Sequence, residues 1–323
     1  MERYRRTSII TRCAVFCIAA AVCTGHLFAA GGAQVCSIVV GDLKREYTIY
    51  LPTAYDGEKS LPVVIMFHGG GGTSKAAMAE TGWDKKAEKE GFIAVFPQAT
   101  APDPTRPASF RGNSAIWNDG SMRFHAGKDG VDDIAYVNAV IDELLSKFKA
   151  DPKRICATGF SNGASMTFRT GLELSRRIAA IAPMSGALWI TNAPIAEPIS
   201  LLYIHGTADP MNPINGGVPT SAGGIKMGEG KAKPPVKDHI ARWAALIECQ
   251  PSPISTESVN GVTTRKYAQG KGGTAIEWIT IDDLGHTWPG GKSLLPASIV
   301  GNMTDKMIAV DVIWDYFKRH VKP

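Results

Sequence analysis

The sequence predicts an α/β fold, in which helices cover both faces of a mostly parallel central sheet. Short apolar runs typical of buried strands alternate with stretches of helical periodicity from about residue 45 onward. One strand-like run leads into the pentapeptide at residues 159–163, and a helical stretch follows it directly. The alternation shows no composition break and no internal repeat. One domain over residues 34–323 is therefore the simplest interpretation.

The expected elements can be placed in order along the chain. The first strand alternates like an edge strand, whereas the later ones are continuous apolar runs of the kind buried on both faces of a sheet. The expected strands are 45–51, 63–67, 92–96, 154–158, 178–183, 201–205 and 274–281. The expected helices are 75–90, 132–148, 235–247 and 304–320. Two long stretches rich in Gly and Pro, 97–130 and 210–235, lack a regular pattern, which is typical of functional loops.

The first 33 residues differ from the rest of the chain. Four arginines precede an apolar stretch that ends in small residues at 29–33. This is the pattern of a signal peptide, with a basic start, an apolar middle and a small-residue cleavage zone. The competing interpretations are a transmembrane anchor, for which the apolar run is at the short limit, and a lipoprotein anchor at Cys23, which a lipobox matches poorly. We expect a secreted protein, periplasmic or extracellular, without stable membrane insertion after cleavage.

Charge and cysteine content exclude further classes of protein. Removing residues 1–33 takes away four Arg and one Glu, so the formal net charge falls from +5 to +2. A nearly neutral protein lacks the basic surface that nucleic acid requires. No Cys/His cluster has the spacing of metal ligands, so these residues predict no metal site. Cys156 is expected to be a buried thiol, whereas Cys36 and Cys249 could form a bridge in an oxidising compartment.

The pentapeptide Gly159-Phe160-Ser161-Asn162-Gly163 has the G-x-S-x-G pattern of a nucleophile on a tight turn between strand and helix. Side chains at the two glycines would collide with neighbouring elements. The strained turn lifts the serine hydroxyl out of the sheet. A serine hydroxyl is a poor nucleophile near neutral pH, so it needs a histidine to take its proton and an acid to orient that histidine. The pattern alone is weak, and the other parts must follow in order.

An acid and a histidine do follow the serine in the expected order. The strand expected over 201–205 leads to Asp209, at the position of the acid, although an aspartate before proline could simply open a turn. Asp282 and Asp283 are alternative acids, but they lie too close in sequence to reach around the imidazole. His286, in the loop after the last expected strand, is the predicted base, and a buried core histidine is the competing interpretation. The remaining histidines lie at strand ends, in a helix, in an irregular loop or near the C-terminus.

Ester chemistry also needs donors for the oxyanion that forms when the serine attacks a carbonyl. A glycine run, Gly69-Gly70-Gly71-Gly72, follows His68 and the strand expected over 63–67. Without side chains, its backbone N–H groups can point inward. We predict the backbone N–H groups of Gly70 and Asn162 as the two donors. A glycine run is more often a flexible turn, and a phosphate loop is disfavoured because no Lys-Ser/Thr follows with the required spacing.

These motifs together resemble an α/β-hydrolase family, the secreted polyhydroxybutyrate depolymerase-type esterases with their feruloyl and acetylxylan esterase relatives. The resemblance covers nearly all of residues 34–323. It rests on several ordered motifs, among them His68-Gly69-Gly70-Gly71-Gly72, Trp117-Asn118-Asp119-Gly120, Gly159-Phe160-Ser161-Asn162-Gly163, His205-Gly206-Thr207-Ala208-Asp209 and Gly285-His286-Thr287-Trp288-Pro289-Gly290. It implies an α/β-hydrolase fold and ester hydrolysis through an acyl-enzyme, without metal or cofactor. It assigns Ser161 as the nucleophile, Asp209 as the acid and His286 as the base.

The resemblance also implies an ester substrate, either a polyester oligomer of the hydroxybutyrate type or a feruloyl or acetyl ester of the plant cell wall. Two departures from the family pattern matter. The cysteine that family members often carry before the catalytic histidine is absent from residues 267–270, so Cys249 lacks its expected partner. No Thr-rich linker or polymer-binding module is present, which favours soluble oligomers and small esters.

Aromatic residues near the motifs are candidates for the substrate pocket. Trp117 and Trp288 are predicted to bind substrate, although packing in the core explains Trp117 and Trp189 equally well. The expected function is therefore a serine esterase. The alternatives are a serine peptidase of the same fold and a non-catalytic carbohydrate-binding relative.

Overall fold

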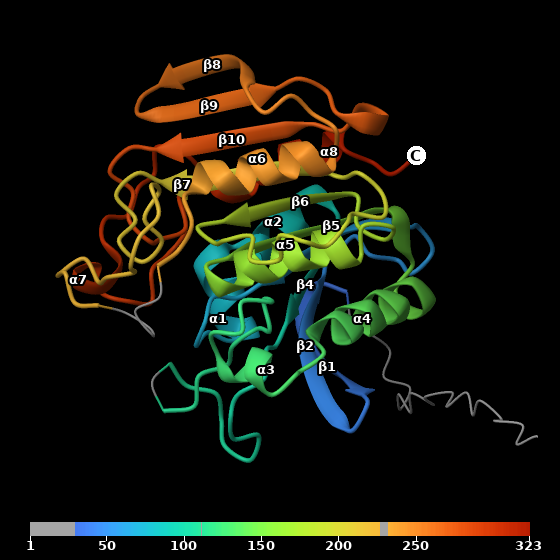
Figure 1. Ribbon diagram of the computed structural model, residues 1–323. Coiled ribbons are helices and arrows are strands. Elements are labelled where there is room, and N and C mark those ends of the chain that lie inside the picture. The colour runs from blue at the N-terminus through green and yellow to red at the C-terminus, as the bar shows by residue number, and fades with distance from the viewer. Residues whose placement is uncertain (1–29, 111, 227–231) are drawn as a thin grey trace, which may run out of the picture.

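The computed structural model describes residues 30–110, 112–226 and 232–323. At its centre lies one sheet with the strand order β1-β2-β4-β3-β5-β6-β7-β10-β9-β8 (Figure 1). The strands from β4 to β10 run parallel to one another. In sheet order they are β4 (Ile93–Pro97), β3 (Leu61–Phe67), β5 (Ala150–Phe160), β6 (Ala180–Met184), β7 (Ser200–Gly206) and β10 (Ile276–Ile281). Each strand expected after 45–51 is found among them, with small shifts in its bounds.

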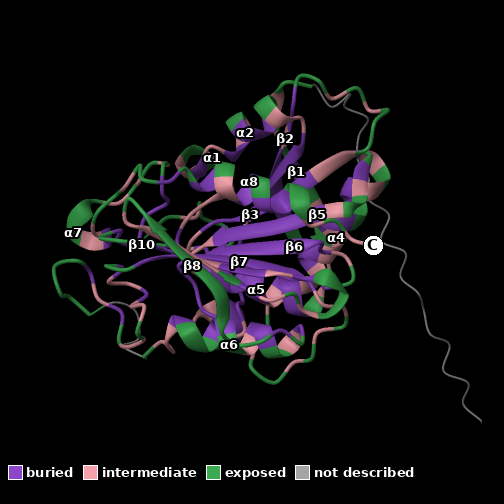
Figure 2. Ribbon diagram, turned by 90° about the horizontal axis from the view of Figure 1, so that it is seen from above, coloured by how far each residue is buried: buried purple, intermediate pink, exposed green. Residues whose placement is uncertain are grey.

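Antiparallel hairpins extend the sheet on both sides. β1 (Gly32–Val40) pairs with β2 (Leu43–Leu51), which joins β4, and β8 (Pro253–Val259) pairs with β9 (Val262–Tyr267), which joins β10. The strand expected over 45–51 is β2, but its prediction as an edge strand is wrong because β1 pairs along its whole length. All residues of β8 are exposed, so it lacks the alternation that marks a half-buried strand (Figure 2).

Helices cover both faces of the sheet, as the sequence predicts (Figure 1). Neighbouring residues of β3 show the two faces: Val63 and Ile65 belong to one core, and Val64 and Met66 to the other. The first core is closed by α4 (Asp133–Lys147), α5 (Asn162–Glu173) and α6 (Val236–Leu246). The second is closed by α1 (Ser74–Thr81), α2 (Trp83–Glu90) and α8 (Ala309–Arg319). The short helical elements are α3 (His125–Lys128), α7 (Ala297–Val300) and η1 (Lys271–Gly273).

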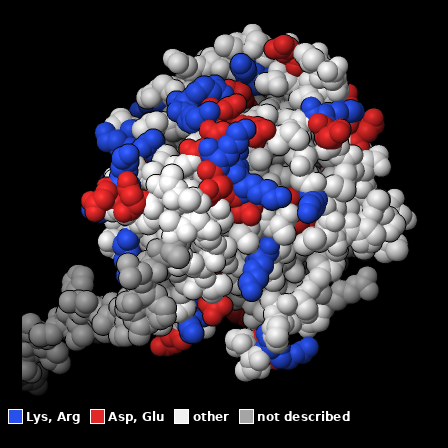
Figure 3. Space-filling view, turned by 180° about the vertical axis from the view of Figure 1, so that it is seen from behind, with Lys and Arg blue, Asp and Glu red and all other residues white. Residues whose placement is uncertain are grey.

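Two helices differ from their predicted extents. The single helix expected over 75–90 is wrong, because Gly82 ends α1 with a left-handed φ of 73° and its N–H donates to the carbonyl of Met78. This is a glycine C-cap, after which α2 starts as a separate helix at Trp83. The helix expected over 304–320 begins only at Ala309. In the rear view, basic and acidic side chains lie next to one another on the surface rather than in a uniform patch (Figure 3).

The expected signal peptide, residues 1–33, lies almost entirely outside the described residues. Its last two residues, Gly32 and Ala33, begin β1 and pair with the end of β2. Within residues 30–110, 112–226 and 232–323, no helix combines the length and the apolar character needed to cross a membrane.

The three cysteines of residues 34–323 are buried thiols. Burial raises the pKa of Cys156 to about 12, in line with the inert thiol expected there. Cys36 lies on β1 at one edge of the sheet, whereas the Cys249 thiol donates to the carbonyl of Ala268, at 2.9 Å, beyond β9 near the other edge. The structure therefore excludes the bridge between Cys36 and Cys249 that the sequence left open.

Candidate active site

Ser161 occupies the turn between β5 and α5. Its backbone has φ 57° and ψ −119°, a conformation that residues other than glycine rarely adopt. A Cβ atom on Gly159 would overlap the carbonyl of Gly163, and one on Gly163 would overlap the carbonyl of Phe67. The turn therefore requires glycine on both sides of the serine, for the steric reason that the pattern suggested.

Asp209 and His286 come together from two loops. β7 and β10 are adjacent parallel strands, so the loops at their carboxyl ends meet at one edge of the sheet. There, Nδ1 of His286 lies 2.8 Å from Oδ2 of Asp209, and both side chains are buried. Oδ1 of Asp209 accepts the backbone N–H groups of Met211 at 2.9 Å and Asn212 at 2.8 Å. Asp209 thus makes the turn as well as the contact, and it is the acid that His286 meets, rather than Asp282 or Asp283.

The electrostatics of this pair follow from burial and from the histidine. Burial alone would raise the pKa of Asp209, but the facing imidazole of His286 and its hydrogen bond hold that pKa below its ordinary value. The carboxylate is therefore ionised at neutral pH and acts only as an acceptor. Nδ1 of His286 must then carry a proton, so Nε2 is the ring nitrogen that can act as the base.

Ser161 and His286 line the same cavity, which has a volume of about 300 Å³. The Phe160 ring packs against the imidazole with the ring centres 4.6 Å apart. The side-chain hydrogen bond of His286 goes to Asp209, and none joins the imidazole to the Ser161 hydroxyl in the described part of the chain. Such contacts are often long without substrate and tighten when it binds. The structure thus forms the acid–histidine pair and brings the serine to the same cavity.

The two predicted oxyanion donors also lie close together. A Cβ atom on Gly70 would be 3.6 Å from Cβ of Asn162. Among the described residues, neither backbone N–H has an acceptor. Asn162 is the first residue of α5, where the helix leaves its N–H groups unpaired and favours negative charge. Two free amides beside Ser161 are suited to bind a developing oxyanion.

His68, at the start of the glycine run, has a structural place. Its Nδ1 lies 2.7 Å from the carbonyl of Gly69, and its Nε2 accepts the backbone N–H of Ala99 at 3.1 Å. These contacts put the ring proton on Nδ1. Burial lowers the pKa of His68 to about 4, so the ring is neutral at physiological pH. His68 therefore fixes the glycine run.

The structure separates the two candidate substrate-binding tryptophans. Trp288 lies in the cavity wall and packs edge-on against Phe160, with ring centres 6.3 Å apart. Trp117 does not line the cavity. It is buried behind the glycine run, where its ring meets Phe67 edge-on at 5.2 Å. The structure thus places Trp117 in the core and not in the cavity wall, because protein covers its ring. This corrects the prediction that Trp117 contacts the substrate directly.

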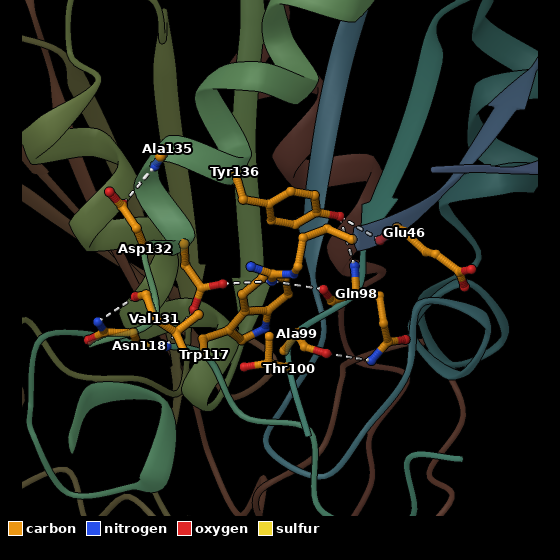
Figure 4. A network of polar contacts seen from close by, with 12 residues as sticks. Glu46, Gln98, Ala99, Thr100, Trp117, Asn118, Val131, Asp132, Ala135 and Tyr136 are labelled. Atoms are coloured by element: carbon orange, nitrogen blue, oxygen red, sulfur yellow. Dashed lines mark hydrogen bonds and ion pairs between the residues drawn. The ribbon is translucent and has the colours of Figure 1, made fainter. Parts of the chain in front are cut away.

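A buried polar network fixes the loop that carries Trp117 (Figure 4). Arg45 and Asp133 form an ion pair at 2.7 Å, and the other oxygen of Asp133 accepts the backbone N–H of Asn118, also at 2.7 Å. Burial raises the pKa of Asp133, and the facing guanidinium opposes that effect. The network joins β2, α4 and the loop that carries Trp117 and Asn118. Its buried contacts therefore fix the position of this loop.

The cavity wall contains residues that sequence reasoning did not identify. Most are apolar: Met66, Ala76, Ala77, Phe110, Met211, Leu294, Leu295 and Val300. Glu80 adds a carboxyl group, and burial raises its pKa. These residues come from separate segments whose meeting depends on the fold, and no local motif marks them.

The sheet, the Ser161 turn between β5 and α5, and the buried pair of Asp209 and His286 define an α/β-hydrolase. Residues 53–237 match the model of the Phospholipase/Carboxylesterase family, and the chain belongs to that family. It is a carboxylesterase-type hydrolase.

Two curated relatives and one solved structure show what the chain is similar to. NocK from Nocardia uniformis subsp. tsuyamanensis, described as an esterase, is 25% identical over 290 residues, covering 86% of this chain and 80% of that protein. Feruloyl esterase B from Piromyces equi is 28% identical over 253 residues, covering 77% of this chain but only 44% of that protein. The acetyl xylan esterase from Aspergillus awamori superposes with a TM-score of 0.57 at 16% identity, covering 88% of this chain and 99% of that one, a likeness that concerns the fold.

Proposed function

We propose that the protein is a serine esterase that hydrolyses carboxylic esters through an acyl-enzyme on Ser161. The observation that carries this proposal is the buried contact of 2.8 Å between Asp209 and His286, next to the cavity that Ser161 lines. An ionised aspartate on Nδ1 prepares the opposite ring nitrogen to accept a proton.

The reaction then follows from the positions of these groups. Nε2 of His286 takes the proton of the Ser161 hydroxyl while its oxygen attacks the ester carbonyl. The N–H groups of Gly70 and Asn162 bind the oxyanion, and Asp209 stabilises the imidazolium that forms. His286 gives its proton to the departing alcohol. It then takes a proton from a water molecule whose oxygen attacks the acyl carbonyl. When the bond between the Ser161 oxygen and the acyl group breaks, His286 returns that proton to the serine oxygen, and the acid leaves.

The cavity supports a substrate with an apolar acyl group. Its wall is largely apolar, with the aromatic rings of Phe110, Phe160 and Trp288. Flat apolar groups pack well against such rings. Together with the similarity to a feruloyl esterase, this favours feruloyl-type and other small aryl or alkyl esters. Hydroxybutyrate oligomers are the second substrate class to test, since the wall would also accept short alkyl chains.

The test compares wild type, Ser161→Ala and a control, Ser146→Ala, in which an exposed serine of α4 is replaced. The substrates are methyl ferulate, p-nitrophenyl butyrate, hydroxybutyrate oligomers and acetylated xylan. We expect Ser161→Ala to lose ester hydrolysis by a factor of about 10⁴ or more while its circular dichroism stays unchanged. Undiminished turnover in this variant would refute the assignment.

Two other outcomes would redirect the proposal. Cleavage of peptides by the wild type without any preference for esters would support a serine peptidase of the same fold. Binding to xylan without turnover of any ester would support a non-catalytic carbohydrate-binding protein.

We also propose that residues 1–33 direct export and that residues 34–323 form one catalytic domain. The basic, apolar and small-residue regions of the sequence support export. The continuous sheet that joins β1 to β8 supports a single domain. Mass spectrometry of the protein recovered outside the cytoplasm should give an N-terminus near residue 34. Recovery of the intact chain from the cytoplasm alone would contradict export.

A further inference from the structure

The two proposed oxyanion donors belong to different segments of the chain. Gly70 lies in the loop after β3, and Asn162 begins α5. Both N–H groups must point at one oxygen at about 2.7–3.1 Å to stabilise the oxyanion. A displacement of about 1 Å can reduce the rate about a hundredfold. Other contacts must therefore fix the position of the loop after β3 relative to the start of α5.

Trp117 is hydrogen-bonded to both segments. Its indole N–H donates to the carbonyl of His68, two residues before Gly70, at 2.9 Å. Its backbone N–H donates to Oδ1 of Asn162 at 2.8 Å, and its carbonyl accepts from Nδ2 of Asn162 at 3.3 Å. The residue is 1% exposed.

Further contacts make this connection rigid. Nδ2 of Asn162 also donates to Asp119 at 3.0 Å, and Asp119 is paired with Arg123 at 3.2 Å. The backbone N–H of Gly71 donates to the carbonyl of Ala115 at 2.7 Å. The segment at 115–119 thus binds both the glycine loop and the first residue of α5.

We propose that Trp117 is a positioning residue that sets the spacing between the two oxyanion donors. This inference rests on the proposed esterase function. Trp117 does not line the cavity that Ser161 lines. It acts through the carbonyl of His68 and the side chain of Asn162, and it makes the two amides converge on one point.

The test is Trp117→Phe, which removes the indole N–H and keeps an aromatic ring. Trp243→Phe is the matched control, because Trp243 is equally buried and its indole N–H also donates to a backbone carbonyl, that of Ile199, at 3.1 Å. For p-nitrophenyl butyrate we expect kcat of Trp117→Phe to fall by about 10- to 100-fold, with KM within about twofold. Binding of phenylboronic acid, which mimics the tetrahedral intermediate on Ser161, should weaken by a similar factor. Trp243→Phe should change kcat, KM and boronate binding by less than about twofold, even where its Tm falls.

A second variant keeps the test decisive if Trp117→Phe fails to fold. Asn162→Ala keeps the backbone N–H and removes only the side chain that Trp117 holds. It should lower kcat with KM unchanged, and its effect should not add to that of Trp117→Phe, because both break one connection. If folded Trp117→Phe or folded Asn162→Ala has a kcat within about twofold of the kcat of Trp243→Phe, the positioning role is overturned. Activity that survives in Ser161→Ala would instead overturn the esterase function itself.

Discussion

The variant Asp209→Asn tests the pair of Asp209 and His286 by replacing one carboxylate oxygen with an amide NH₂ group. Oδ1 of Asp209 accepts two backbone N–H groups, those of Met211 and Asn212. In Asp209→Asn, only the amide oxygen can take that place, so the amide NH₂ must face His286. The NH₂ group donates and cannot accept from Nδ1. The imidazole is therefore forced into the tautomer with its proton on Nε2, where it cannot take the proton of Ser161.

The size of the effect follows from this tautomer. In a serine triad, the same exchange lowers kcat by about 10⁴, which corresponds to roughly 5 kcal/mol of activation free energy. The side chains have the same shape and the site is buried, so the variant should fold.

The assay is the steady-state hydrolysis of p-nitrophenyl butyrate at pH 7, with urea unfolding to show that the variant is folded. Asp132→Asn is the control. Asp132 caps α4 by accepting the N–H of Ala135 at 2.8 Å, an interaction that asparagine also makes. The control should keep wild-type kcat. More than a tenth of wild-type kcat in folded Asp209→Asn would refute the tautomer argument.

Three further predictions concern stability. In the folded protein the pKa of Asp209 lies below its ordinary value of 3.8, so its carboxylate adds stability above that pH and loses it as the pH falls from there through the lowered pKa. Urea titrations should show that the advantage of wild type over Asp209→Asn shrinks as the pH falls below about 4. Arg45→Met leaves Asp133 as an unpaired buried charge and should cost about 3–5 kcal/mol of unfolding free energy in urea; a loss under about 1 kcal/mol would contradict this. Gly163→Ala should prevent folding or lower Tm strongly, as seen by circular dichroism. Gly223→Ala, where the nearest atoms to the added methyl group lie at an ordinary contact distance of 3.7 Å, should fold normally.

The sequence predicted the parts of the fold and site that leave a local pattern. Continuous apolar runs identified the parallel strands at the centre, and the order of Ser161, Asp209 and His286 identified the three residues to test. The glycines beside the serine were recognised because a steric requirement of one turn fixes them.

The rest depends on contacts that no local pattern records. β8 is exposed along its length, so nothing in its sequence distinguishes it from a loop. The helix over 75–90 was predicted as continuous because a single glycine within a helical pattern does not by itself mark the end of a helix. In the structure, Gly82 ends α1. Trp117 was interpreted as a pocket residue because its partner, the carbonyl of His68, is brought to it only by the folded sheet.

The central claim is that Ser161 forms a covalent bond with the acyl group, and it can be measured directly. The protein is incubated with diethyl p-nitrophenyl phosphate, which traps activated serines, and is then digested and mapped by mass spectrometry. We predict one diethyl phosphoryl group per chain on Ser161, with loss of esterase activity in proportion to labelling. Full esterase activity in protein that carries no adduct on Ser161, or complete inactivation by labelling elsewhere, would contradict the account.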